Sequence, residues 1–222
     1  LAVGADETFD PAPHLKGAKG PGPVKADLYN DRATGKEKPR VGGQVTLHFR
    51  GKPRVLCDWI DNSAVVGYMY QWIANSLATN DRETWEYVPD LAESWITEDV
   101  VTTKDGTKVR GKVTETSNGV KVKTELNEPE IAKANIDRVD REVAFTFKMN
   151  PAAHWQDGKP VTAHDVYFSW KLLKNQWLGV PSIQNYYADL NECTVIDDHT
   201  VRLVYAKQYW EAFSFASGFA IR

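Results

Sequence analysis

The sequence predicts a globular α/β fold, and three observations support this prediction. Apolar and polar residues alternate with a period of two from Val143 to Met149, which is typical of a β-strand with one buried face. The segment from Thr162 to Leu173 has the capping residues and the apolar spacing of an amphipathic helix. Two short apolar runs that flank residues 197–200 then predict a β-hairpin.

Composition narrows the class of protein before any motif is considered. The chain has 222 residues, 42% of them apolar, and a formal net charge of −3. This composition is typical of a globular protein and argues against a disordered, collagen-like or coiled-coil chain. No apolar stretch reaches the roughly 18 residues of a membrane span, and no long basic run is present to bind a nucleic-acid backbone. We therefore expect a soluble protein without a nucleic-acid partner.

Motifs that would indicate a catalytic serine, a bound nucleotide or a metal site are missing from the sequence. It contains no serine nucleophile elbow and no glycine-rich phosphate loop after a strand. The two cysteines, Cys57 and Cys193, are too few for a disulfide framework and lack the paired spacing of a metal site. One disulfide bridge and two unreactive thiols are both compatible with the sequence, and we expect no cofactor.

Residues 1–40 are expected to form a flexible N-terminal arm. They contain ten Gly and Pro residues and only two aromatic residues, which leaves too few apolar side chains for a core. The chain begins at Leu1 without a signal-peptide pattern, so we expect that processing or truncation removed whatever preceded it. The first strand is predicted over Val41–Arg50, where apolar and polar residues alternate.

A helix of about four turns is predicted to follow Ser63. Apolar residues recur at three-to-four spacing up to Leu77, and Trp72 lies on the stripe expected to face the core. We expect Asn62 or Ser63 to cap this helix by accepting a hydrogen bond from a first-turn N–H group. Trp59 lies in the loop before the helix, where no periodicity predicts that it is buried.

The segment 101–142 differs from the rest of the chain, because 17 of its 42 residues are charged and its apolar residues are mostly isolated valines. Two dipeptides, Asp105-Gly106 and Asn118-Gly119, are typical of tight turns between strands. Valines alternate with polar residues on both sides of the second turn. We expect a projecting, solvated β-ribbon that has no core of its own.

Three motifs occur in order along the chain. They are PDLAESW at 89–95, WQDGKPVTAHDVYFSW at 155–170 and VIDDHTV at 195–201, and a Gly42-Gly43 pair precedes them. Together they resemble the extracellular solute-binding proteins of the oligopeptide and dipeptide transport family, family 5. The resemblance runs from residue 41 to about residue 210 and covers only the front part of such a protein. It implies that the chain is an N-terminal fragment whose second lobe is missing.

The resemblance implies an α/β fold of the periplasmic-binding-protein-like class II type, of which this chain forms part of one lobe. Residues 41–62 are expected to supply the first strand and loop of that lobe. Residues 63–210 are expected to form an inserted subdomain of mixed α+β structure, and residues 211–222 a truncated strand that returns to the lobe. The charged ribbon departs from the family pattern and is interpreted as an insertion.

Candidate ligand-binding residues come from two sources. The loop position of Trp59 and the Tyr186-Tyr187 pair favour ligand contact, because aromatic faces line many binding sites. In peptide-binding relatives, the segment before the first subdomain helix and a tyrosine after the second helix face the ligand. The resemblance therefore implies ligand-binding roles for Asn62, Ser63 and Tyr186. A simple capping role for Asn62 or Ser63 is the alternative.

The function implied by the resemblance is that of a non-catalytic receptor. It would bind a small peptide outside the cytoplasm and pass it to the membrane permease of an ABC importer. We expect a periplasmic or cell-surface monomer, with a lipid anchor as one way of holding it at the membrane. Oligosaccharides and metal complexes are alternative solutes for the same fold, and the eight tryptophans favour an oligosaccharide slightly.

Two functions of other classes compete with this interpretation. A metal-dependent hydrolase could use a cluster of imidazole and carboxylate groups formed by His154, Asp157, His164 and Asp165. The two aspartates are, however, also explained by a turn and a helix cap, so no metal site is expected. Alternatively, the ribbon at 101–142 is a docking surface for a partner protein.

Overall fold

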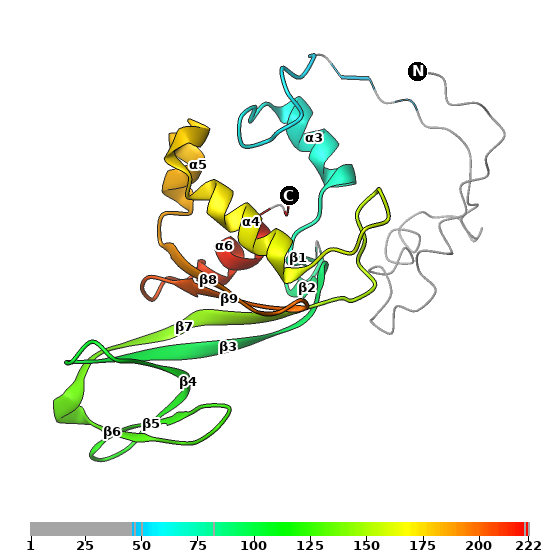
Figure 1. Cartoon of the computed structure of the whole chain (residues 1–222). Coiled ribbons are helices and arrows are strands. Elements are labelled where there is room, and N and C mark those ends of the chain that lie inside the picture. The colour runs from blue at the N-terminus through cyan, green and yellow to red at the C-terminus, as the bar shows by residue number, and fades with distance from the viewer. Residues whose placement is uncertain (1–45, 47, 50, 82, 220, 222) are drawn as a thin grey trace.

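The computed structural model describes residues 46, 48–49, 51–81, 83–219 and 221. Its main feature is a seven-stranded sheet with the strand order β6-β5-β4-β3-β7-β9-β8, in which every neighbouring pair is antiparallel (Figure 1). The strands of this sheet are β3 (Ala92–Thr103), β4 (Lys108–Glu115), β5 (Gly119–Lys123), β6 (Glu130–Ala132), β7 (Ile136–Met149), β8 (Leu190–Asp197) and β9 (Thr200–Tyr205). A separate hairpin consists of β1 (Ala78–Asn80) and β2 (Tyr87–Pro89).

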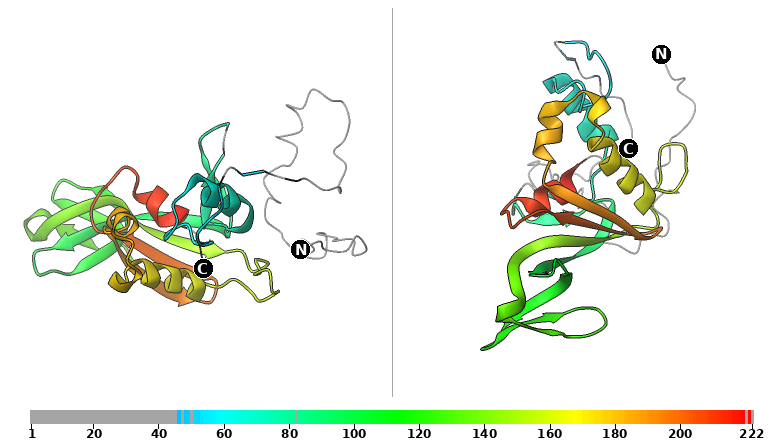
Figure 2. Two further views of the ribbon diagram at one scale, coloured as in Figure 1. Left: turned by 90° about the horizontal axis from the view of Figure 1, so that it is seen from above. Right: turned by 60° about the vertical axis from the view of Figure 1, so that its left-hand side comes forward.

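Helices cover only one part of the large sheet. They are α3 (Ala64–Ile73), α4 (Ala163–Leu173), α5 (Pro181–Tyr186) and α6 (Ala212–Gly218), with short 3-10 helices at Lys133–Asn135 and Gln176–Leu178. The helices α4 and α6 pack on strands β8 and β9, and α6 also reaches β7. Figures 1 and 2 show the helices together on one side of the sheet, while β4, β5 and β6 extend away from them. The fold is therefore mixed α/β, as predicted.

Three local predictions are confirmed. The strand predicted at Val143–Met149 is the C-terminal half of β7, which pairs with β3 and β9. The predicted hairpin is β8–β9, with Asp197 paired to Thr200. The capping box forms at the start of α4, where the Asp165 carboxylate accepts the backbone N–H of Thr162 at 2.7 Å. Each of these features depends on residues close together in the chain.

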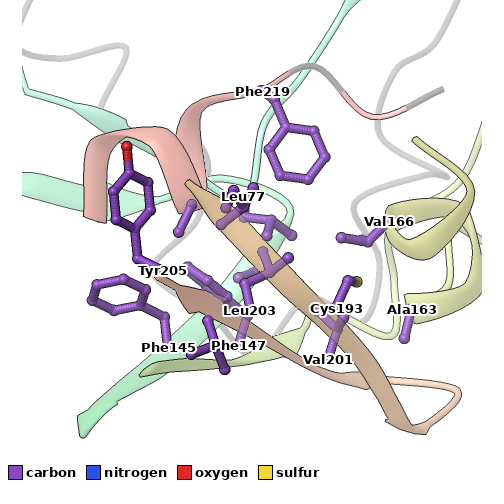
Figure 3. Close-up of a cluster of buried hydrophobic side chains, with 14 of the residues drawn as sticks. Leu77, Phe145, Phe147, Ala163, Val166, Cys193, Val201, Leu203, Tyr205 and Phe219 are labelled. Atoms are coloured by element: carbon purple, nitrogen blue, oxygen red, sulfur yellow. The ribbon is translucent and has the colours of Figure 1, made fainter. Parts of the chain in front are cut away.

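The main hydrophobic core lies between the sheet and helices α4 and α6 (Figure 3). It contains fully buried large side chains from strands, helices and loops: Leu77, Phe145, Phe147, Val166, Leu203 and Phe219. Burying one such side chain stabilises a fold by about 1.5–3 kcal/mol. This cluster therefore holds the helices against β7, β8 and β9.

The ribbon at 101–142 has a core of its own, so the prediction that it lacks one was wrong. Its strands are the distal parts of β3 and β7 together with β4, β5 and β6. Four valines from three of these strands are buried in one cluster: Val101, Val113, Val120 and Val122. Alternate residues of adjacent strands share one face, so valines that are isolated in the sequence meet in the sheet. Its projection from the helix-covered part is visible in Figure 2.

Both turns predicted in the ribbon are present. The first, at Asp105-Gly106, connects β3 to β4, and Gly106 has a φ of 85°. The second, at Asn118-Gly119, connects β4 to β5. A Cβ atom at Gly119 would collide with the backbone carbonyl of Ile131, so glycine is required for the close pairing of β5 with β6.

The strand predicted at 211–222 is wrong for its first part, because Ala212–Gly218 forms helix α6. Three small residues of this helix are buried: Ala212, Ala216 and Ser217. Phe213 and Phe215 both pack against the main core from the helix. The strand was expected from the family resemblance, whereas small side chains that allow a helix to lie close to the sheet favour the helix here.

Helix α3 is shorter than predicted and presents a different face to the core. It ends at Ile73, so Leu77 lies beyond it, and Val66 is the one buried residue within it. Trp72, which was predicted to face inward, is 78% exposed. Large apolar residues occur on several sides of this helix, so their spacing could not identify the buried side.

The N-terminal predictions are mostly outside the described part of the chain. The arm at 1–40 lies outside the described residues, as does most of the strand predicted over 41–50. The members of that segment that are described, Thr46, His48 and Phe49, are not in a strand. Within the described ranges, no helix is both long enough and apolar enough to span a membrane.

The two cysteines are free thiols, which decides between the alternatives that the sequence left open. Burial raises the pKa of the Cys193 thiol to about 12, so almost none of it is thiolate at pH 8. Cys57 is only half-buried. We expect a thiol reagent at pH 8 to label Cys57 in the native protein, and to label Cys193 only after unfolding in guanidinium chloride. Mass spectrometry of the labelled peptides measures this, and rapid native labelling of Cys193 in a Cys57→Ser variant would contradict it.

Candidate functional site

A hollow of about 500 Å³ lies where the loop before α3 meets the C-terminal half of α3, strand β1, helix α5 and the end of α6. Figure 1 shows how far apart these elements are in the chain. Four aromatic residues contribute to the lining: Trp59, Tyr70, Tyr187 and Phe219. Amide, hydroxyl and carboxylate side chains complete it. This volume and this mixture are typical of small-molecule sites.

The loop that carries Trp59 is held in place by the buried carboxylate of Asp61. That carboxylate accepts the backbone N–H groups of Arg54 at 2.9 Å and of Ser63 at 3.1 Å. The first of these bonds, with the contacts of Ser63, keeps the pKa of Asp61 below its usual range. The Asp61 N–H in turn donates to the carbonyl of Cys57 at 2.8 Å. These hydrogen bonds hold the loop in one conformation. Trp59 is only 6% exposed and contributes to the lining of the hollow.

A second wall is the segment between α3 and β1. Asn75 donates its side-chain amide to Asp90 at 2.7 Å, and the Ser76 N–H donates to the same carboxylate at 3.0 Å. The Leu77 N–H donates to the carbonyl of Ser217 at 2.9 Å, which joins this wall to the end of α6. The side chains of Asn75, Ser76 and Asp90 are therefore held by hydrogen bonds on this wall.

Tyr187 forms a third wall just after α5. Its ring makes T-shaped contacts with the rings of Phe215 and Phe219, with centroid distances of 5.6 Å and 6.0 Å. Burial, and secondarily the negative charge of Asp58, raise the pKa of Tyr187 to about 12. The phenol therefore stays protonated even at pH 10, where an exposed tyrosine is half ionised.

The residues predicted to bind a ligand are not all brought together. Trp59 lines the hollow, although it is buried rather than exposed as its loop position suggested. Asn62 and Ser63 lie at the opposite end of α3 from the residues of that helix that line the hollow. Ser63 is the N-cap residue of α3 but makes no side-chain cap, and its own N–H donates to the Asp61 carboxylate. Tyr186 is 63% exposed and stacks on Phe215 at 6.3 Å outside the lining.

Tyr187, which the sequence singled out together with Tyr186, does line the hollow. Other lining residues were not identified from the sequence: Tyr70, for example, belongs to a helix whose inner face could not be assigned. Asp90 had a detectable signal, because it is the second residue of the first motif at 89–95. Asp58 carried none, since a single aspartate in a loop is common in any protein.

The charged side chains that are described in the lining of the hollow are acidic. Its lining contains two carboxylates, those of Asp58 and Asp90, and no Lys, Arg or His from the described part of the chain. The last turn of α3, whose residues Tyr70 and Gln71 contribute to the lining, contains no basic residue. Within the described part of the lining, the charged side chains are therefore all acidic.

The residues of the hydrolase alternative have separate partners. His154 Nδ1 lies 2.7 Å from the carbonyl of Ala152, and the Asp157 carboxylate pairs with Lys159 at 3.0 Å. His164 faces Asp198 at 3.4 Å on the surface, while Asp165 is used by the capping box. In the ranges that the structure describes, no group of three or more His, Cys, Asp and Glu side chains could hold a metal ion. The geometry gives this alternative no support.

Comparison with known proteins adds three findings. Residues 86–222 match the family model of bacterial extracellular solute-binding proteins, family 5 middle region. The fold is similar to that of the periplasmic murein tripeptide-binding protein MppA in its unliganded open form, with a TM-score of 0.50 and 18% identity over 76% of this chain and 28% of MppA. The peptidoglycan-binding protein YepA of Agrobacterium fabrum is 35% identical over 66 residues, which are 30% of this chain and 10% of YepA. This chain thus spans about a quarter or less of the length of these relatives.

Proposed function

This chain belongs to the bacterial extracellular solute-binding proteins of family 5, and on that premise we propose that it forms part of a peptide receptor. The receptor captures a small peptide outside the cytoplasm and delivers it to the membrane permease of an ABC importer. The observation that carries this proposal is the preformed hollow of about 500 Å³ with aromatic and polar walls. Such a mixture suits a peptide, because the backbone needs hydrogen-bonding partners and the side chains need apolar surface.

Within this proposal, the hollow is one wall of the complete site. The chain spans 28% of MppA, so a longer protein would supply the facing wall, and closure of the two walls around the peptide would exclude water. Gln71, Asn75 and Thr79 are placed to bond the peptide backbone, and Trp59 to contact a side chain. Asn62, Ser63 and Tyr186 lie outside the hollow and would touch only parts of a ligand that extend beyond it.

The other properties of the receptor follow from the same proposal. It acts as a monomer outside the cytoplasm, in the periplasm or held at the cell surface by a lipid anchor, and it changes no covalent bond of its ligand. The 222-residue chain alone would bind peptide weakly, because a ligand bound to one wall stays largely exposed to water. Submicromolar peptide binding by the chain alone would contradict the two-wall arrangement.

The experiment that tests the function is native mass spectrometry of the intact protein, purified gently from its own source. Co-purifying masses that differ by amino-acid residues would support a peptide receptor. Hexose spacings would replace the peptide by an oligosaccharide, the solute that aromatic walls also favour. Bound metal would indicate a metal-complex receptor or revive the hydrolase.

A variant that fills the hollow tests its location. Ala74 is half-buried and lines the hollow in extended backbone just after α3. We expect Ala74→Trp to lower ligand occupancy at least tenfold, because the indole would occupy the space of the ligand. The control is Lys171→Trp, which adds the same ring to an exposed position of α4 away from the hollow. Full occupancy in Ala74→Trp would place the site elsewhere.

A further inference from the structure

A second hollow, of about 460 Å³, lies where the ribbon leaves the main sheet. The register partners Thr97 on β3 and Phe145 on β7 contribute to its lining. Further lining residues belong to the segment 208–213, which connects β9 to α6 and begins that helix (Figure 1). The second hollow shares no lining residue with the first hollow, which Trp59 and Tyr187 line, so the two are separate sites.

A bulge in β7 places two neighbouring side chains on the second hollow. Successive residues of a strand normally point to opposite faces of the sheet, yet Arg141 and Glu142 both line this hollow. The pairing of β3 with β7 changes register here, and Glu142 has a φ of 54°, which is unfavourable for a residue with a Cβ atom. The buried Asp99 carboxylate holds both residues, because it accepts the Glu142 N–H at 2.9 Å and an Arg141 guanidinium N–H at 3.0 Å. Bulges and backbone strain are both concentrated near functional sites.

Aromatic rings form another part of the lining, and neighbouring rings hold them in position. Phe213 makes a T-shaped contact with Phe145 at a centroid distance of 5.4 Å, and Tyr209 stacks on Phe215 at 6.2 Å. Trp210 lies beside Tyr209, with 6.0 Å between the ring centroids, and is 84% exposed. A ligand that covers the Trp210 ring would remove a large apolar surface from water, which favours binding.

We propose that the second hollow binds a sugar ring of a saccharide. A pyranose ring has C–H groups on its faces and hydroxyl groups around its edge, so it needs an aromatic face beside hydrogen-bonding side chains. Trp210 supplies an accessible aromatic face. The carboxylate of Glu142 accepts hydrogen bonds, and the amide of Gln208 both donates and accepts them. This site lies apart from the first hollow and does not depend on the peptide-receptor proposal.

Two other classes of ligand fit the second hollow less well. An anion would need the Arg141 guanidinium, which already donates to Asp99, to the Val113 carbonyl at 2.8 Å and to Glu115 at 3.3 Å. An entirely apolar ligand would take water from the Glu142 carboxylate without replacing its hydrogen bonds. A neutral polyhydroxylated ring avoids both costs, because its hydroxyl groups can donate to the carboxylate while its face covers the indole.

The test measures binding of maltose, cellobiose and N,N′-diacetylchitobiose to the intact protein by isothermal titration calorimetry. We expect at least one of these disaccharides to bind with millimolar or tighter affinity, and with little dependence on salt because the ligand is neutral. Sorbitol has the hydroxyl groups but no ring, and we expect it not to bind. Absence of binding by all of the disaccharides, or equally tight binding of sorbitol, would overturn the proposal.

Tryptophan variants locate the bound disaccharide. Trp210→Ala is expected to weaken its binding about tenfold, because the aromatic face is lost. The control Trp177→Ala removes an indole that is 88% exposed but lies outside the lining, and is expected to change the affinity less than about twofold. Ala74→Trp, which fills the first hollow, is expected to leave the affinity unchanged. Loss of binding in Ala74→Trp with unchanged binding in Trp210→Ala would place the saccharide in the first hollow and overturn this proposal.

A glycine variant separates a binding role of Glu142 from a structural one. Glycine adopts the left-handed conformation without strain, so Glu142→Gly is expected to unfold at the same or a higher urea concentration than the parent protein. The same variant is expected to bind the disaccharide several-fold more weakly, because the accepting carboxylate is gone. Unchanged disaccharide affinity in Glu142→Gly would overturn the proposal.

Discussion

Phe147→Ala is expected to lower the free energy of unfolding by about 3–5 kcal/mol. Phe147 is fully buried near the C-terminal end of β7, between its register partners Trp95 on β3 and Val201 on β9. Its ring lies 5.8 Å from the ring of Phe213 on α6, measured between centroids. The strands β3 and β9 on either side of β7 and the helix α6 above it hold the backbone around Phe147 in place. The space that the ring leaves therefore stays open as a cavity. The loss therefore includes the cost of a cavity as well as the lost burial.

Urea unfolding of the intact protein measures this effect. The matched control is Ile96→Ala on the neighbouring strand β3, where the side chain is 59% exposed and its removal is expected to cost less than about 0.5 kcal/mol. If Phe147→Ala fails to fold, Phe147→Leu keeps the position measurable with an expected loss of about 1 kcal/mol. A loss below about 1 kcal/mol in Phe147→Ala would mean that this core is not well packed.

Asp99→Ala is expected to destabilise the ribbon by about 3 kcal/mol while leaving the helix-covered part of the sheet folded. Asp99 is buried on β3, where the pairing with β7 changes register between Glu98 and Val100. Its carboxylate accepts the backbone N–H groups of Val113 at 3.0 Å and Glu142 at 2.9 Å, and a guanidinium N–H of Arg141 at 3.0 Å. Removing the carboxylate leaves these donors without their acceptor at the point where the ribbon leaves the main sheet.

Amide hydrogen exchange distinguishes a local from a global effect. We expect lost protection at the ribbon valines Val113 and Val122, and unchanged protection at Phe147 in the main core. The control Asp137→Ala removes an exposed aspartate from the N-terminal end of β7, which belongs to the ribbon. We expect it to change the protection of neither region. Uniform loss of protection across both regions would show that the ribbon and the main sheet unfold as one unit.

The sequence was a sufficient guide wherever neighbours in the chain decide the structure. The period of two over Val143–Met149 identified half of β7, and the spacing of Thr162 and Asp165 identified the start of α4. Hydrogen bonds within a turn or a cap involve residues a few positions apart, so their signals survive in the sequence. The ordered motifs likewise identified the family that residues 86–222 match.

The candidate site was less predictable, because its walls come from five segments of the chain. Trp59 was selected for its apparent exposure and turned out to be buried with an edge on the hollow. Tyr186 and Tyr187 are adjacent in sequence, yet only Tyr187 lines the hollow, since it follows α5 and turns toward α6. A choice between two neighbouring tyrosines depends on the last turn of a six-residue helix, which the sequence pattern does not resolve.

The amino-acid sequence by itself thus determined the family, the mixed α/β class and the strands and helices with strong local patterns. The tertiary structure decided which side of each pattern is buried. The ribbon valines became a core because three strands place them on one face, and α6 became a helix because Ala212 and Ala216 fit closely against the sheet. Trp72 is exposed because α3 packs through Val66 instead. Burial depends on what lies across the interface, and that partner is usually distant in the chain.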